Sequence, residues 1–372
     1  MSISRVAVDD SILMKGMIST AGSKILGNFT PPFNSAVIDK LAAAGIAEIV
    51  QTRPNEFGAS LTAGYGCVDA VAKGEADVGL GCDFNGSIRR EASAAGIAFI
   101  KPTYGTVSRF GLVSAAPSME CIGVACRDVD KGFYALSLIA GADCRDGTMA
   151  SADSYSFSSG EKSIEDVKVG VIGGSEEAAW DAADRLRALG TEAEAFDFPL
   201  LDYAPAAAYI ISAAEASNSI SRFDGIKYGL RAEGHSNLES LYVKSRSEGF
   251  TFETKLFTLA GMLVLTKEKY ESHFEKALKM RRLVRDAVFE AFDRYDIVMM
   301  PAGRSASGAE DGFADFCDAY ASLKYLALPN LAGVPALSLP GGIQLMAGSF
   351  GERLLQEAGR CFQVLAEKGA AI

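Results

Sequence analysis

A regular alternation of short β-rich runs with amphipathic helical runs is the strongest constraint on the fold of this chain. The clearest unit is residues 167–198, where VKVGVIGG predicts a strand and a turn, EEAAWDAADRLRAL predicts a helix that ends at Gly190, and EAEAFDF predicts the next strand. Ser175 is suited to cap the start of that helix. Strands that alternate with helices in this way are typical of an α/β fold whose sheet is covered by helices on both faces.

The same pattern recurs toward both ends of the chain. Val6–Val8 predicts a first strand, residues 34–44 predict a helix, and IAEIVQT predicts the strand that follows. Residues 268–294 predict a long helix, and YDIVMM predicts a strand that stops at Pro301. Because no fixed-period repeat and no low-complexity linker divides the sequence, we predict one domain over residues 1–372.

Charge and composition exclude several classes of function. The chain has 36 basic and 47 acidic side chains and a net charge of −11, so a broad surface for direct nucleic-acid binding is not expected. We interpret the basic side chains of the helix over 268–294 as a solvated face. They are Lys276, Lys279, Arg281, Arg282 and Arg285.

The remaining composition argues for an intracellular protein without metal or cofactor. Seven scattered cysteines form no CxxC pair, which indicates reduced thiols, neither disulfides nor zinc ligands. The turn GVIGGS, residues 170–175, does not fit the GxGxxG dinucleotide pattern. The N-terminus lacks a signal-peptide layout, and no apolar run approaches the ~18 residues of a membrane span. We therefore expect a cytoplasmic protein without membrane contact.

The segment GLGCDFNGSIRREAS, residues 79–93, is the best candidate for chemistry. Ser87 is flanked by glycine, and the backbone amides of Phe84, Asn85, Gly86 and Ser87 follow one another. Such amides can form an oxyanion hole for a serine nucleophile that attacks an amide. Only two histidines are present, so a serine–histidine–acid triad has few ways to form.

With the segment that follows it, KPTYGTVSRFGLVSAAPSMECIGVACRDV, this loop resembles the amidase signature family, whose patterns are GSDTGGSIR and KPTYGRVSRYGLV. Among its branches, the chain is most similar to the A subunit of Glu-tRNA(Gln) and Asp-tRNA(Asn) amidotransferases. Further similar segments lie at 23–41, 213–233, 243–250, 268–300 and 330–340. The resemblance implies a single α/β/α domain around a large mixed central sheet, with a nucleophile-loop core at about residues 60–150.

The resemblance also implies a Ser, cis-Ser, Lys triad, of which only one member is present. Ser87 takes the nucleophile position. The family lysine lies in IKDNI, and the matching VDDSI puts Asp9 in its place. The bridging serine lies in GGSSGGS, and the same spacing back from Ser87 puts Ala63 there, with Thr62 as the only hydroxyl a one-residue shift would supply. An ordinary Asp, with a pKa near ~4, is a poor base for a serine hydroxyl.

The substrate side of the implied site is altered in the same way. The arginine that holds the glutamine carboxylate would fall near Phe257, and the aspartate that holds its amine near Leu323. Asp315 and Asp318 lie close to that second position, and Tyr228 matches the family tyrosine. Against the family, the chain starts at the lysine-bearing strand, lacks a segment between Phe57 and Thr62, and is short after Pro340, which implies a truncated member.

Three functions follow as alternatives. In the first, the chain is a pseudoenzyme, a non-catalytic or weakly catalytic homologue of that amidotransferase component, and serves protein biosynthesis in an assembly or accessory role. Its partners would be B- and C-type amidotransferase subunits, or further copies of itself. In the second, it is an active truncated amidase that uses Ser87 on a small amide, with a base such as Lys15 or Lys24. In the third, it binds a small amide or amino acid without reaction.

For the loop itself the sequence also offers a structural interpretation. Gly86 and Ser87 would be retained because the loop packs on the sheet, with Asp83 and Arg89 as a local ion pair. Cys67 and Cys82 are then inert buried thiols without a partner base.

Overall fold

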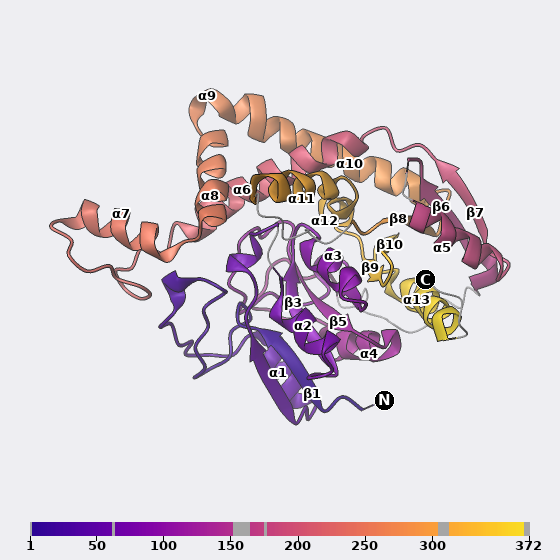
Figure 1. Ribbon diagram of the computed structural model, residues 1–372, viewed down its shortest axis with the longest axis horizontal. Helices are drawn as coiled ribbons and strands as arrows, with labels where there is room; N and C mark the ends of the chain where they lie inside the picture. The colour runs from indigo at the N-terminus through magenta and orange to yellow at the C-terminus, as the bar shows by residue number, and fades with distance from the viewer. Residues whose placement is uncertain (1, 62–63, 152–163, 175–176, 304–311, 368–372) are drawn as a thin grey trace.

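The computed structural model describes residues 2–61, 64–151, 164–174, 177–303 and 312–367. Its ten strands form one sheet in the order β2-β1-β3-β5-β4-β9-β10-β8-β6-β7 (Figure 1). Parallel pairs lie at the two ends of the sheet and antiparallel pairs in the middle, so the predicted mixed sheet is confirmed. The strands are β1 Arg5–Asp9, β2 Glu48–Thr52, β3 Val78–Asp83, β4 Ala98–Lys101, β5 Cys121–Cys126, β6 Lys168–Ile172, β7 Glu192–Phe196, β8 Ile297–Pro301, β9 Ala336–Leu339 and β10 Ile343–Ala347.

Helices cover both faces of this sheet, and the alternation of side chains along each strand shows which helices share a face. Val6 and Val8 of β1 belong to one apolar cluster with α1 Ala36–Ala43, α4 Val129–Ile139, α5 Glu177–Arg187 and α13 Glu352–Glu367. On the opposite face, Ala7 packs with α2 Gly66–Ala72 and α3 Ser87–Ala94. Farther along that face lie α6 Ala204–Ile220, α8 Phe252–Val264, α10 Lys276–Phe292, α11 Gly312–Leu326 and α12 Leu328–Ala332.

The helix α7, Leu238–Gly249, is an exception to this layered packing. It projects from the body of the molecule and is joined through α8 to α9, Lys267–Lys269 (Figure 1). Every helix among the described residues is too short or too polar to cross a membrane.

Most predicted elements occur where the sequence places them. The predicted first strand lies in β1, the helix over 34–44 is α1 with Ser35 as its N-cap, and the 167–198 unit is β6, α5 and β7. Ser175 lies outside the described residues.

The helix predicted over 268–294 is not uniform. It is divided into α9, a π-helical turn at Tyr270–Glu275, and α10. The prediction of a solvated basic face is wrong for Arg281, which is mostly buried and donates hydrogen bonds to the carbonyl oxygens of Leu331 and Ser118. Lys276, Lys279, Arg282 and Arg285 are exposed as predicted.

Candidate active site

The predicted nucleophile lies at the carboxyl edge of two parallel strands. β1 ends at Asp9 and its neighbour β3 ends at Asp83, so both strands point to the same edge of the sheet. A sharp turn through Gly86 follows β3, and α3 begins at Ser87. Gly86 has φ +87°, and a Cβ there would come within 2.7 Å of the Leu326 Cβ, so this turn requires glycine.

Ser87 is enclosed by two side chains that offer no base. The Ser87 residue is 1% exposed, and its Oγ lies 2.7 Å from Asn85 Oδ1 and 2.6 Å from the Tyr65 hydroxyl oxygen. Asn85 Oδ1 only accepts, so the Ser87 proton is directed to it and the Tyr65 hydroxyl donates to Ser87 Oγ. Burial raises the pKa of Tyr65, which keeps the phenol protonated. This arrangement holds the serine proton and does not remove it.

Two of the four predicted oxyanion-hole amides are already hydrogen-bonded within the loop. The Gly86 amide donates to Asp83 Oδ1 at 2.7 Å, and the Ser87 amide donates to Asn85 Oδ1 at 2.9 Å. The backbone amides of Phe84 and Asn85 donate no hydrogen bond to any described residue. The loop therefore uses part of its donor set to fix its own conformation.

Asp9, at the position of the family lysine, is fully buried and hydrogen-bonded to Thr52 and Cys67. Its Oδ1 accepts hydrogen bonds from Thr52 Oγ1 at 2.8 Å and from the Cys67 amide at 2.9 Å. Burial raises the pKa of Asp9 to about 6, although its hydrogen bonds with Cys67 and Thr52 oppose that shift. Because the Cys67 amide belongs to the first turn of α2, Asp9 anchors the start of that helix.

Cys67 is not isolated, in contrast to the prediction. Its Sγ lies 3.2 Å from Asp9 Oδ2, so a carboxylate contacts this thiol. Burial, followed by the charge of Asp9, raises the pKa of Cys67, and burial also raises the pKa of Cys82. Both groups are therefore protonated thiols and poor nucleophiles.

No lysine contacts Ser87 within the part of the chain that the structure describes. Lys15 and Lys24, the bases considered for an active enzyme, are exposed, whereas Ser87 is buried. Lys101 is buried, but its Nζ donates to the carbonyl oxygens of Pro102 at 3.0 Å and Val334 at 2.8 Å. Burial lowers the pKa of Lys101, and its hydrogen bonds go to these two carbonyl oxygens and not to Ser87.

The predicted ion pair between Asp83 and Arg89 is confirmed. Arg89 Nε lies 2.5 Å from Asp83 Oδ2, and both side chains are fully buried. Arg89 Nη2 also donates to the carbonyl oxygen of Leu326 at 2.7 Å, and the guanidinium reaches Gln344 and Asn330. This network ties the nucleophile loop to β10 and α12.

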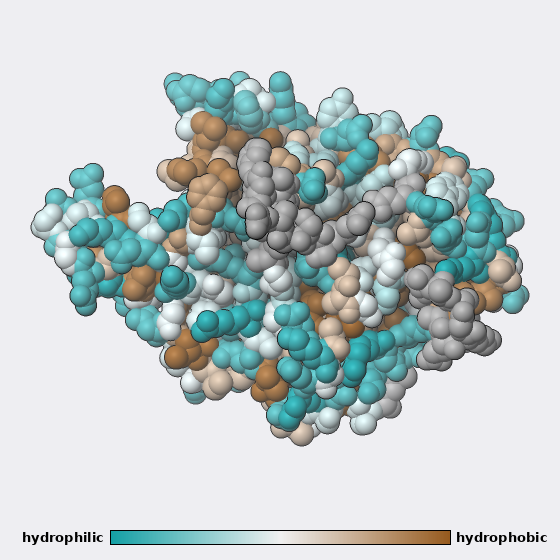
Figure 2. Space-filling view, viewed as in Figure 1, coloured by the Kyte–Doolittle hydropathy of each residue, from teal (hydrophilic) through white to brown (hydrophobic). Residues whose placement is uncertain are grey.

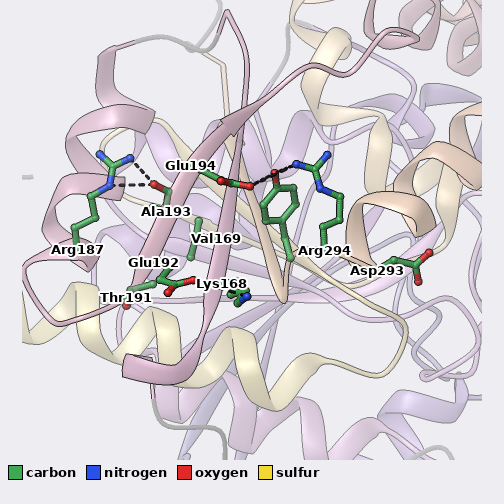
Figure 3. Close-up of a pocket in the computed structure, with 10 residues that line it drawn as sticks. Lys168, Val169, Arg187, Thr191, Glu192, Ala193, Glu194, Asp293 and Arg294 are labelled. Atoms are coloured by element: carbon green, nitrogen blue, oxygen red, sulfur yellow. Dashed lines mark hydrogen bonds and ion pairs between the residues drawn. The ribbon is translucent and has the colours of Figure 1, made fainter.

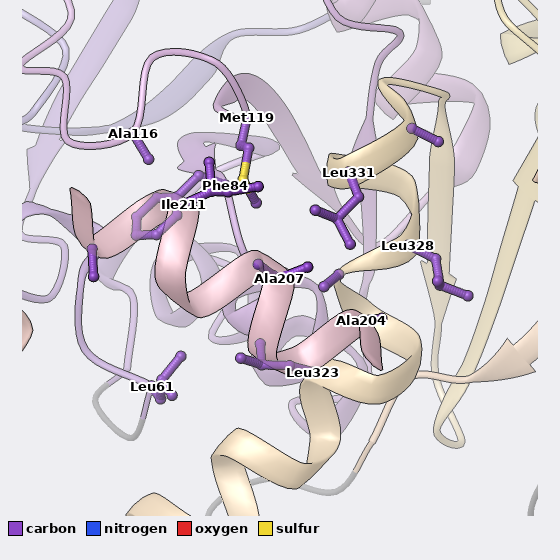
Figure 4. Close-up of a cluster of buried hydrophobic side chains, with 14 of the residues drawn as sticks. Leu61, Phe84, Ala116, Met119, Ala204, Ala207, Ile211, Leu323, Leu328 and Leu331 are labelled. Carbon is purple, nitrogen blue, oxygen red and sulfur yellow. The ribbon is translucent and has the colours of Figure 1, made fainter. Parts of the chain in front are cut away.

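Apolar side chains pack above the turn at Phe84. Phe84, 2% exposed, shares a cluster with Met119 and with side chains from α6, α11 and α12 (Figure 4). Ile211 and Ala207 of α6 and Leu323 of α11 are among the residues that close over the loop.

Two of the predicted substrate positions, Phe257 and Leu323, carry buried apolar side chains. Phe257 is buried and contacts Tyr209 edge to face at 5.2 Å between ring centroids, and Leu323 is 2% exposed. Asp318 is exposed, and the side chain of Asp315 lies outside the described part. Tyr228 is 40% exposed and packs on Phe29 at the rim of a separate hollow.

Another hollow, of about 700 Å³, lies at the β6–β7 edge of the sheet and not at Ser87 (Figure 3). Several of its polar side chains are hydrogen-bonded within the protein. Arg187 donates to the Ala193 carbonyl oxygen, and Tyr295 donates to Glu194 Oε1 at 2.7 Å. No group of three or more His, Cys, Asp or Glu side chains in the described ranges is arranged to hold a metal ion.

Sequence reasoning missed Tyr65 and the side chain of Asn85. The signal for Tyr65 was available, because in the alignment that puts Ala63 at the bridging serine, Tyr65 stands at a glycine of GGSSGGS. A phenol cannot occupy the space of a glycine without changing what surrounds the nucleophile. Ala63 and Thr62 lie outside the described residues.

The comparisons place this site in a family. The Amidase family model matches residues 5–68 and 63–355. The A subunit of glutamyl-tRNA(Gln) amidotransferase from Lachnoclostridium phytofermentans is 38% identical over 371 residues, covering 91% of this chain and 75% of that protein. The corresponding protein of Lachnospira eligens is 35% identical over 400 residues, covering 96% and 83%.

That second alignment also bears on the segment expected to be missing. It runs over 400 residues, whereas 96% of this 372-residue chain is only about 357, so roughly forty aligned positions of the relative face no residue here. The two pieces of the family match meet at residues 63–68, close to the predicted gap.

Solved structures agree with the sequence comparisons. The crystal structure of the glutamyl-tRNA(Gln) amidotransferase A subunit from Thermotoga maritima matches with a TM-score of 0.76 and 27% identity, over 96% of this chain and 82% of that one. A structure described as a vestigial protein complex linked to an s-triazine catabolic enzyme shares the fold, with a TM-score of 0.79 and 24% identity over 97% and 83%. Together with the sheet order and the Ser87 loop, these matches show that the chain belongs to the amidase signature family.

Proposed function

We propose that this chain is a catalytically impaired member of the amidase family that acts as an assembly or accessory subunit. The observation that carries the proposal is the environment of Ser87. Its hydroxyl is bonded to Asn85 and Tyr65, at 2.7 and 2.6 Å, and neither group can accept the proton as a base. Nucleophilic attack by a serine requires an adjacent base.

Two further features support impairment. Asp9 is hydrogen-bonded to Thr52 and Cys67, so it fixes the start of α2, whereas the Ser87 hydroxyl is bonded to Asn85 and Tyr65. Phe84, three residues before Ser87, packs in a large apolar cluster, and Ser87 itself is only 1% exposed. A site closed in this way by packed side chains has lost both its base and its access.

Hydrolysis is tested by ammonia release from glutamine, asparagine and acetamide, with the purified chain and its Ser87→Ala variant compared. We expect the same background rate from both proteins. An intact amidotransferase A subunit serves as the positive control, and each assay is run with and without B- and C-type amidotransferase subunits. Ser87-dependent ammonia release would establish the active-amidase alternative and refute impairment.

The assembly role is supported by the relatives, since those 35–38% identical to this chain are named as subunits. Co-purification of the tagged full chain with purified B- and C-type subunits from the same organism tests it. We expect a stable complex of defined stoichiometry. If both subunits elute separately from the chain at micromolar concentration, the accessory role with these partners is ruled out.

Binding of a small ligand is a second candidate, favoured by the hollow beside Tyr228. This hollow, of about 570 Å³, is lined by Asn28, Phe29, Lys227, Tyr228 and Arg231 among others, so aromatic and cationic groups converge on it. Such a lining suits a small carboxylate. Glutamine and glutamate should raise the melting temperature of the wild type but not of Arg231→Ala. Equal melting temperatures with and without ligand would exclude this candidate.

A further inference from the structure

Several large apolar side chains are exposed to solvent along the outward face of α8. Phe252 is 78% exposed, Leu256 39%, Leu259 62% and Leu263 58%, and Met262 beside them is 57% exposed. Figure 2 shows apolar side chains gathered over α8, between the projecting α7 and α9. Contiguous exposed apolar surface of this kind marks an interaction site.

The helix that carries this face is firmly held. Its inner side buries Thr254, Phe257, Gly261 and Val264, and a Cβ at Gly261 would lie within 2.0 Å of the Ala213 carbonyl oxygen of α6. α8 therefore lies backbone to backbone against α6 and cannot turn its outer face inward. A helix that is apolar on both sides is normally covered on both sides.

The spacing of the exposed side chains indicates what covers them. Phe252, Leu256, Leu259 and Leu263 are separated by four, three and four residues, which is the a/d spacing of a coiled-coil seam. At 1.5 Å per residue the seam is about 16 Å long. The surface is therefore shaped for one α-helix, which packs its own knobs between these four side chains.

The same seam is complementary to itself in an antiparallel arrangement. In this arrangement Leu256 of the first copy faces Leu259 of the second, and Phe252 of the first faces Leu263 of the second. Exchanging the two copies gives the other two contacts of the seam. Each a position then meets a d position, as antiparallel seams require. A two-fold axis generates all four contacts from one surface.

A small pocket lies beside the seam. It has a volume of about 240 Å³ and is lined by Phe250 at the end of α7 and by Leu259 and Met262 of α8, with Arg246, Ser247, Lys255 and Thr258 at its polar side. Because Leu259 belongs to both the seam and the pocket wall, the apolar surface continues from the seam toward α7.

The charges near the seam do not oppose this pairing. Lys255, on its flank, donates from Nζ to the Ser247 carbonyl oxygen at 2.8 Å, so the ammonium is directed back onto its own chain. Arg246 stacks over Phe250 with its guanidinium carbon 4.9 Å from the ring centroid. Two copies with the same charges can therefore approach without placing like charges in the seam.

We propose that α8 is a self-association surface through which two copies of this chain form an antiparallel, two-fold symmetric dimer. The partner is a second copy of the chain, and the contact is made by Phe252, Leu256, Leu259, Met262 and Leu263. This inference is independent of whether Ser87 retains activity, because it rests only on the surface of α8. A seam of two heptads is short, so the dimer dissociates in the micromolar range.

Sedimentation equilibrium of the full chain from about 5 to about 200 µM tests the proposal. The expected result is a concentration-dependent shift from one chain of 39.2 kDa toward twice that mass. Leu259→Asp should raise the dissociation constant at least about tenfold, because it places a carboxylate in the seam. Leu283→Asp is the matched control, since Leu283 is 51% exposed on α10, outside this surface, and should leave the constant unchanged.

Phe252→Ala provides a second test that does not depend on a buried charge. Phe252 is the first residue of α8 and is 78% exposed, so its truncation should leave the folded monomer intact while weakening the dimer. Circular dichroism verifies folding of all variants. A chain that stays monomeric throughout the concentration range overturns the proposal, and so does a dimer whose dissociation constant is indifferent to both Leu259→Asp and Phe252→Ala.

Discussion

The hydroxyl of Ser87 has one proton to donate, and Asn85 Oδ1 lies where that proton must go. The Tyr65 hydroxyl completes the shell from the other side. The bond to Asn85 stabilises the neutral serine, because an alkoxide would lose this donation. At the scale of single residues, the same contacts that satisfy a buried polar group make it a poor nucleophile.

The first prediction at this scale concerns Asp9 and the pH dependence of the free energy of unfolding. Its pKa is raised to about 6 in the folded protein by burial, against an ordinary value of 3.8. The folded state therefore binds this proton more tightly than the unfolded state, and stability falls as the pH rises from about 4 to about 6. The loss amounts to about 3 kcal/mol. Urea unfolding at several pH values should show that Asp9→Asn removes this part of the decline.

Asp77 is the control of opposite sign. Hydrogen bonds from the Ser4 amide and other nearby donors lower its pKa to about 2, so the stability it adds is present above pH 4 and is lost as the pH falls. Asp77→Asn should therefore weaken the protein most at neutral pH. The interpretation of Asp9 fails if Asp9→Asn shows the same pH profile as the wild type.

A second prediction concerns Arg89, whose buried charge is paired with the buried carboxylate of Asp83. Arg89→Ala leaves Asp83 as an uncompensated buried carboxylate and should cost about 3–5 kcal/mol of unfolding free energy. Arg145→Ala is the matched control, since Arg145 pairs with Asp143 at 2.8 Å but is 41% exposed. That variant should cost less than about 1 kcal/mol. Similar losses in denaturant titrations of both variants would contradict this account of the loop.

The residues of the loop also show how far sequence reasoning reaches. The Asp83–Arg89 pair follows from two opposite charges six residues apart across a tight turn, and it could be predicted. The contact between Tyr65 and Ser87 could not, since it depends on how α2 lies against α3 in space. The same holds for Arg281, whose neighbours on its own helix are solvated while its guanidinium reaches Leu331 and Ser118 from distant parts of the chain.

Among the elements, the turn between β3 and α3 controls where the nucleophile lies, and Gly86 controls that turn. Gly86→Ala would force a side chain into φ +87° and within 2.7 Å of the Leu326 Cβ and 2.8 Å of Arg89 Nη2. We expect a loss of about 2–4 kcal/mol in unfolding free energy, the sum of backbone strain and overpacking.

Gly96, which follows the other end of α3, separates those two causes. It has φ +74°, but a Cβ there would meet nothing within 4 Å. Gly96→Ala should therefore cost only the backbone strain, about 1 kcal/mol. If chemical denaturation finds the two variants equally stable, close packing of the turn against α11 does not contribute.

Local patterns were enough to locate elements but not to describe their irregularities. The run over 268–294 has the composition of a helix throughout, yet six of its residues, Tyr270–Glu275, form a π-helical turn. Such a turn adds one residue and shifts the helical face that follows it, which a regular 3.6-residue pattern does not anticipate. Strand order within the sheet likewise arises from pairing between distant segments, which no local pattern encodes.

The whole molecule is organised by the continuous sheet, which joins the first and last strands of the chain in one hydrogen-bonded layer. β5 lies in one half of the strand order and β6 in the other, yet Ile122 and Val169 belong to the same apolar cluster on one face. A core that continues across the sheet couples the unfolding of the two halves. One domain over residues 1–372 therefore remains our prediction.

The single tryptophan makes that prediction measurable. Trp180 lies on α5 and packs against the cluster at the β6–β7 end, so its fluorescence reports on that end, whereas far-ultraviolet circular dichroism reports on all elements. Ile122→Ala, which opens a cavity at β5 in the other half of the sheet, should cost about 2–5 kcal/mol. If the sheet unfolds as one unit, this distant substitution shifts the fluorescence and dichroism midpoints in urea by the same amount. A dichroism transition that moves while the Trp180 transition stays in place would show two independently unfolding parts.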